Sequence, residues 1–201
     1  GYIAWAELYL ESLRYIYGDK VNVRIDALNL TDEHIAFLKK IHSNLDLRNI
    51  RKDIREAAGE VDVDEDTFKS WKNEIETGNL TNRNYLFKIY ISVNQRYRKM
   101  QSVINEAKNT GYKYIIHSDI DLYLRKNIDG MLRILDEHDF AAYFRSRNAS
   151  HKNVLGAFLA FNLKDQVDIF VHEWMRQIDL VPFKERWRGF GQSALWYAIE
   201  N

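Results

Sequence analysis

Residues 112–121 read YKYIIHSDID, a hydrophobic segment that ends in two aspartates, Asp119 and Asp121. The apolar residues predict a buried strand, and residues two apart on an extended chain point to the same side. Both carboxylates would then emerge at the carboxyl end of the strand, where open α/β sheets bind their ligands. Two adjacent carboxylates are costly unless solvent or a cation compensates them, and a hard divalent metal carrying a phosphate group is the natural partner. The alternative is a turn whose aspartates only cap the next helix.

Strand and helix patterns alternate on both sides of this segment, which predicts an α/β fold with a mostly parallel central sheet flanked by helices. The predicted helices lie near residues 5–16, 35–41, 84–109, 131–135, 167–178 and from 192 onward, and the predicted strands near 21–25, 45–50, 140–144 and 154–161. No repeat, low-complexity tract or linker interrupts the pattern, so we expect a single domain over residues 1–201. Because a helix comes first, we expect this domain to be taken from a longer chain and to lack its first strand.

Composition narrows the class of protein. A hydrophobic content of 46% and a mean hydropathy of −0.47 are typical of a soluble globular protein. Lys+Arg and Asp+Glu both total 29, so the net charge is zero and gives no indication of nucleic-acid binding. The lack of cysteine excludes disulfides and thiolate metal ligands. No run approaches the ~20 apolar residues of a transmembrane helix. We expect a cytoplasmic protein, with any membrane association left to segments outside this sequence.

Three local signals follow one another in a fixed order. They are the strand ending in His117-Ser118-Asp119-Ile120-Asp121, the apolar run Val154–Asn162 with Gly156 inside it, and the segment Phe190–Ala198 with Gln192 near its start. Together they resemble the GT-A glycosyltransferases, particularly the family-8-like branch, from about Asn84 to the end of the chain. The resemblance implies metal-dependent transfer of a sugar from a nucleoside-diphosphate sugar, with a UDP-sugar as the expected donor. The acceptor would be a carbohydrate, a lipid or a protein.

The resemblance also implies roles for individual residues. Asp121 would bind the metal, Mn²⁺ or Mg²⁺, directly, and Asp119 would share the metal or contact the ribose. Arg98 would reach the donor diphosphate, unless it lies on a solvated basic helix face. Gly156 belongs to the segment that lines the sugar pocket, and a glycine inside a strand often marks the close approach of a ligand or of backbone. Gln192 would project toward the transferred sugar, unless it only caps the last helix.

The chain departs from the family pattern in three places. Gly191 stands where an aspartate is expected before Gln192, the His-bearing carboxyl-terminal motif is not found before Asn201, and the first strand is missing. A candidate base beside the acceptor is not singled out either, because Glu173, Asp179 and Glu185 all qualify.

Two other functions therefore stay open. A haloacid-dehalogenase-like phosphohydrolase also has a hydrophobic strand ending in Asp-x-Asp, with Asp119 as nucleophile and Asp121 as general acid. That motif normally opens the chain, however, and needs a later acidic pair that we do not find downstream. The other alternative is a non-catalytic domain that keeps the GT-A-like fold for binding.

Overall fold

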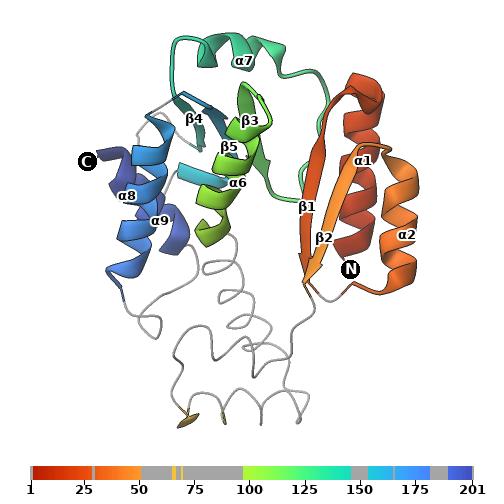
Figure 1. Cartoon of the computed structure of the whole chain (residues 1–201), viewed down its shortest axis with the longest axis horizontal. Helices are drawn as coiled ribbons and strands as arrows, with labels where there is room; N and C mark the ends of the chain where they lie inside the picture. The colour runs from red at the N-terminus through yellow and green to blue at the C-terminus, as the bar shows by residue number, and fades with distance from the viewer. Residues whose placement is uncertain are drawn as a thin grey trace. The chain divides into compact units, whose positions relative to one another are not determined.

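The computed structural model describes residues 2–28, 30–50, 65–66, 69, 97–145, 154–164, 166–181 and 190–200, without the side chains of 2, 28, 50, 97–99 and 190. The elements are α1 (Tyr2–Tyr17), the 3-10 turn η1 (Gly18–Lys20), β1 (Val23–Leu28), α2 (Asp32–Ile41), β2 (Leu45–Ile50), α6 (Tyr97–Asn109), β3 (Tyr114–Ser118), α7 (Asp129–Leu135), β4 (Phe140–Phe144), β5 (Val154–Asn162), α8 (Val167–Asp179) and α9 (Phe190–Glu200) (Figure 1). Helices and strands are interspersed along the described parts of the chain, which is therefore an α/β protein.

The chain packs as two compact units. The first unit comprises Gly1–Asp53 and Ser118–Arg133, and the second unit comprises Ile54–His117 and Ile134–Asn201. Whether the two units fold as the single domain expected from the sequence stays a prediction.

In the first unit, β1, α2 and β2 form a β–α–β segment whose two strands are parallel and lie side by side (Figure 1). Alternate strand residues share a face, and this face packs on α1 and α2. The core consists of Ala6, Leu10 and Leu38, with Ile3, Val23, Ile25, Leu30, Ile41, Leu45, Leu47 and Ile120 packed against it. The intervening strand positions hold charged residues that form ion pairs along each strand. Arg24 pairs with Asp26 at 3.1 Å on β1, and Arg48 pairs with Asp46 at 2.9 Å on β2.

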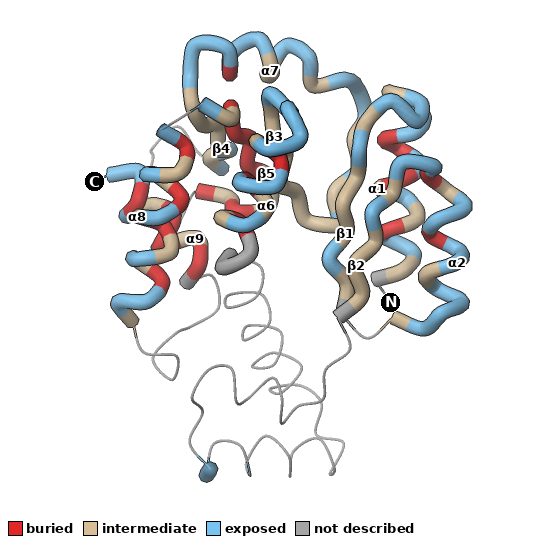
Figure 2. The backbone as a smooth tube through the Cα atoms, viewed as in Figure 1, coloured by how far each residue is buried: buried red, intermediate tan, exposed pale blue. Residues whose placement is uncertain are grey.

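The second unit holds a three-stranded sheet in the order β3-β5-β4, with α6, α8 and α9 packed in the same unit. Buried residues, red in Figure 2, are concentrated on β5, α8 and α9. Its core consists of Met100, Ile104, Val154, Leu159, Phe161, Val167, Val171, Trp174, Ile178, Ala194, Leu195 and Ala198.

The described strands form small, mixed sheets instead of the one mostly parallel sheet expected from the sequence. β1 and β2 are parallel, but β4 and β5 are antiparallel. The reason is the short connection between the last pair, residues 145–153. Parallel pairing needs a crossover of about a dozen residues or more, usually a helix, whereas an antiparallel pair can be joined by a short loop.

The long predicted helix is described from Tyr97 onward as α6, and residues 84–96 lie outside the described part. The helix ends at Asn109, and Gly111 then takes a positive φ of 80°, which is the left-handed conformation that favours glycine after a helix. The amides of Gly111 and Tyr112 donate to the carbonyls of Lys108 and Ala107, both at 3.1 Å. The turn at Gly111 connects α6 to β3, which precedes Asp119 and Asp121 in the chain.

Candidate functional site

The two aspartates follow β3 in a tight turn. The strand ends at Ser118, and the amide of Leu122 donates to the carbonyl of Asp119 at 3.3 Å, so Asp119 and Asp121 are the first and third residues of the turn. Asp119 is half-buried and Asp121 is exposed. The extended backbone that the sequence argument assumed stops before Asp121, so strand alternation does not set the direction of that side chain. The helix-capping alternative does not hold, because α7 begins only at Asp129.

Residues 119–128, here called the acidic loop, begin beside a part-buried pair of hydroxyl groups. The hydroxyl of Ser118 donates to the hydroxyl oxygen of Tyr9 on α1 at 2.7 Å. Burial raises the pKa of Tyr9 above its ordinary value, and the hydrogen bond from Ser118 lowers it by less. Inside the loop, Ile120 packs against the core of the first unit. The residues flanking Asp119 on both sides are therefore fixed to the first unit.

The rest of the acidic loop is also bonded to α1. The amide of Leu124 donates to the hydroxyl of Ser12 at 3.3 Å, and the amide of Ile128 donates to the hydroxyl of Tyr17 at 2.6 Å. The Tyr17 hydroxyl donates in turn to Asp129 at 3.4 Å. Buried or half-buried backbone amides need such partners, and in this loop the side chains of α1 supply them.

Gly156 is buried in β5 at a break in strand pairing. Ala142 of β4 pairs with Leu159, but the next residue, Tyr143, pairs with Leu155, so Gly156 to Phe158 are left out of the register. Such bulges occur often beside functional sites, and a glycine adapts to them at low cost. The bulge explains the glycine in structural terms and leaves its role in a sugar pocket as a proposal.

Gln192 lies half-buried in the first turn of α9. The neighbouring Gly191 is buried, and its carbonyl accepts a hydrogen bond at 3.2 Å from the indole nitrogen of Trp174, which is fully buried on α8. α8 therefore fixes the turn from which Gln192 projects.

Arg98 lies in the first turn of α6, and its side chain is outside the described part of the structure. Asp119 and Asp121 belong to the first unit, whereas Arg98, Gly156 and Gln192 belong to the second. The structure thus fixes the surroundings of each group within its own unit.

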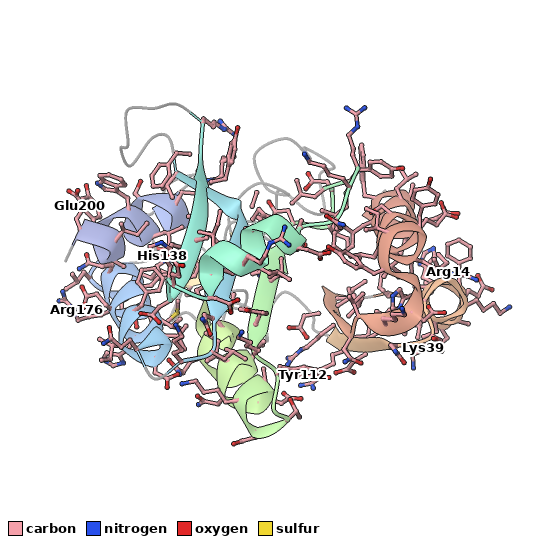
Figure 3. The ribbon with its side chains drawn as sticks, turned by 90° about the horizontal axis from the view of Figure 1, so that it is seen from above. Arg14, Lys39, Tyr112, His138, Arg176 and Glu200 are labelled. Atoms are coloured by element: carbon pink, nitrogen blue, oxygen red, sulfur yellow. The ribbon has the colours of Figure 1, made fainter. Side chains whose placement is uncertain are left out.

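Of the candidate bases, Glu173 is the one whose chemistry the structure decides. Both of its carboxylate oxygens accept hydrogen bonds from Arg176 at 2.7 Å, and Arg176 points outward from α8 (Figure 3). The guanidinium first, and then Gln177, lowers the pKa of Glu173 to about 2. A general base works best with a pKa near the operating pH, so Glu173 is poorly suited to that role. Asp179 ends α8 and is exposed, and Glu185 lies outside the described residues.

A metal ion at the acidic loop would have only part of its shell from the protein. Within the described ranges, no group of three or more His, Asp or Glu side chains is arranged to hold a cation. Two carboxylates nevertheless fit Mg²⁺ or Mn²⁺, because such ions in phosphate-transfer sites are commonly held by one or two carboxylates together with substrate phosphates and water. The donor set therefore suits a cation that arrives with a phosphate ligand.

Comparisons with family models, with curated proteins and with solved structures found no match to this chain. None of the described helices is long and apolar enough to cross a membrane.

Sequence reasoning missed the hydroxyl groups of α1. Tyr9 fits the apolar stripe of that helix and reads as a core residue, while Ser12 and Tyr17 follow it at helical spacing. A serine on the buried side of a helix was the available signal, because a buried hydroxyl needs a partner. Its partner, the acidic loop, is more than a hundred residues away in the sequence.

Proposed function

We propose that this chain is a metal-dependent glycosyltransferase of the GT-A type, a fold with a mostly parallel central sheet. It would transfer a sugar from a nucleoside-diphosphate sugar, with UDP as the expected nucleotide. The observation that carries the proposal is the pair Asp119 and Asp121 in the turn directly after β3 of an α/β chain. Open α/β sheets bind their ligands outside the carboxyl ends of their strands, and this turn follows the carboxyl end of β3.

The chemistry explains why carboxylates are needed there. Breaking the bond between sugar and diphosphate leaves negative charge on the diphosphate, and a bound divalent cation stabilises that charge. The carboxylate of Asp121 binds the cation, and that of Asp119 binds the cation or the ribose. Arg98 contributes a positive charge to the diphosphate, and Gln192 orients the sugar.

The phosphohydrolase alternative is less well supported. It needs further acidic residues beside Asp119 and Asp121 to complete its metal site, and no such group occurs among the described residues. In addition, β1, α2 and β2 precede the aspartate-bearing strand, whereas in that family the motif strand comes first.

The decisive variant is Asp121→Asn, which keeps the size of the side chain and removes its charge. We expect Mn²⁺-dependent binding of the nucleoside diphosphate to weaken more than ten-fold, or by above about 1.4 kcal/mol, with the fold unchanged by circular dichroism. Calorimetric titration with UDP, GDP and CDP, each with and without Mn²⁺, measures this. Glu137→Gln is the matched control, because Glu137 is exposed in a turn of the second unit. An unchanged affinity in Asp121→Asn removes Asp121 from the site.

Activity separates the three candidate functions. Release of nucleoside diphosphate from a panel of UDP-, GDP- and CDP-sugars with Mn²⁺ supports the glycosyltransferase. Metal-dependent phosphate release from an aryl phosphate supports the phosphohydrolase instead. If neither reaction occurs and no nucleotide gives a metal-dependent shift of the melting temperature, the result favours the non-catalytic binding domain.

A further inference from the structure

We infer that α1 is the positioning element of the acidic loop, and that Tyr9, acting through Ser118, holds Asp119 where a cation and its phosphate ligand can be bound. This inference rests on the proposed function, because it assigns a role to residues that support the same pair of aspartates. Tyr9, Ser12 and Tyr17 are positioning residues in this account and do not touch the ligand.

The first step of the argument is the connection between Tyr9 and Asp119. Ser118 is the last residue of β3, and its hydroxyl donates to the part-buried hydroxyl of Tyr9 at 2.7 Å. Only one peptide bond separates Ser118 from Asp119, so a shift of the serine moves the carboxylate. Hydrogen bonds behind a metal-binding side chain commonly change metal affinity or activity by 10–100-fold when they are removed.

The second step is that hydroxyls of α1 hold backbone amides of the acidic loop. Its described internal backbone bond is the one between Leu122 and Asp119, and it contains no helix or strand between Ser118 and Asp129. Two of its amides, those of Leu124 and Ile128, are instead bonded to hydroxyls of Ser12 and Tyr17. The conformation of the loop at Leu124 and Ile128 therefore depends on side chains of α1.

The third step is that Ser12 is itself fixed in place. Its side chain is almost fully buried, and its hydroxyl donates to the carbonyl of Tyr9 at 2.7 Å while it accepts from Leu124. The bonds of Ser12 thus connect the backbone of Tyr9 to the middle of the loop. α1 contacts the loop at its start, middle and end, so the helix sets the geometry of both aspartates.

The test compares Tyr9→Phe, Ser118→Ala and the double variant with Tyr15→Phe. Tyr15 is the matched control, because it lies on the same helix with 89% of its surface exposed. Two quantities are measured on folded protein, after urea titration has shown that each variant is fully folded. They are the amide hydrogen-exchange rates of residues 119–124 without ligand and the Kd for UDP in the presence of Mn²⁺.

We expect the loop amides to exchange at least ten-fold faster in Tyr9→Phe and in Ser118→Ala than in the wild type. In the double variant they should exchange no faster than in either single variant. Non-additivity of this kind is the signature of two residues that act through one contact. The Kd for UDP with Mn²⁺ should rise about 10–100-fold in the same variants. Ser118→Thr, which keeps the hydroxyl, should restore both quantities, and Tyr15→Phe should change neither.

The two quantities keep this inference separate from the proposed function. If wild-type protein binds no nucleoside diphosphate with Mn²⁺, the proposed function fails, and the exchange rates alone decide whether α1 positions the loop. If wild-type protein binds UDP but Tyr9→Phe leaves both the exchange rates and the Kd unchanged, the positioning role is wrong. Faster exchange with an unchanged Kd also overturns it, because the loop would then move without effect on the ligand.

Discussion

Tyr9 shows how a single side chain in this protein combines packing with polar contact. It is half-buried on α1, and its hydroxyl accepts the hydrogen bond from Ser118. Burial disfavours the phenolate, so the pKa of Tyr9 lies above the ordinary value of 10.0. The same desolvation raises the pKa of Tyr17 further along the helix.

A raised pKa in the folded state predicts the direction of a pH effect. The unfolded chain releases the Tyr9 proton near pH 10, while the folded chain holds it to higher pH. The stabilisation is therefore complete below pH 10 and is lost as the pH rises through the folded value. We expect the free energy of unfolding of wild-type protein to fall between pH 9 and pH 11 more steeply than that of Tyr9→Phe. Urea titrations at several pH values measure the two slopes, and equal slopes would contradict the burial of the Tyr9 hydroxyl.

The contact between α8 and α9 depends on one buried hydrogen bond as well as on apolar packing. Trp174 lies in the core of the second unit, and its indole nitrogen donates to the carbonyl of Gly191 in the first turn of α9. A carbonyl in that position would be costly to leave without a partner. The pair therefore fixes the turn that carries Gln192.

We predict that Trp174→Phe lowers the free energy of unfolding by about 2–4 kcal/mol. The loss combines a buried hydrogen bond, about 1–3 kcal/mol, with the space left by the smaller ring. The midpoint of a urea titration measures it. Trp5→Phe is the control, because Trp5 is half-exposed on α1, and exposed substitutions usually change stability by less than about 0.5 kcal/mol. Equal effects of the two substitutions would mean that the Trp174 contact adds no stability.

Two separate cores raise the question of whether the chain unfolds as one domain. Leu10 is fully buried in the core of the first unit, and Ile178 in that of the second. Small single domains usually unfold in one cooperative step, in which a loss of packing anywhere lowers the stability of the whole.

We predict that Leu10→Ala destabilises both units equally, by about 2–5 kcal/mol, as expected for a large-to-small change in a core. Hydrogen exchange of the slowest amides in β1 and in β5 measures the two units separately. Ile178→Ala, in the core of the second unit, should likewise lower the protection of the slowest amides in both units equally. A loss of protection confined to the unit that carries the substitution would show that the chain contains two independently folding domains.

Several local features of the fold can be predicted from the sequence. Alternation of Val21, Val23 and Ile25 predicted a strand, and the structure has β1 from Val23 onward, with Val23 and Ile25 packed against the core of the first unit. Apolar spacing likewise predicted α8, and Gly111 predicted the end of α6. Each of these patterns reflects contacts made within a few residues or by one face of one element, so neighbouring positions carry the information.

The acidic pair was only partly predictable. Its place directly after a hydrophobic strand follows from the sequence, but the turn at Asp119 does not, because the residues Ile120 and Leu122 favour continued extension as much as a turn. Ile120 turns inward because the core of the first unit accepts it. Contacts distant in the sequence thus decided the backbone conformation of the loop.

In the part of the chain that the structure describes, the amino-acid order by itself predicted the helices and strands, and it placed two carboxylates at the end of a hydrophobic strand. The tertiary structure alone decided that β4 and β5 pair as antiparallel neighbours with a break at Gly156, and that hydroxyls of α1 hold the loop bearing Asp119 and Asp121. The physical reason is the range of the interactions. Periodicity and turn chemistry act between residues a few positions apart, whereas hydrogen bonds between Tyr9 and Ser118, or Ser12 and Leu124, exist only after the chain has brought distant residues together.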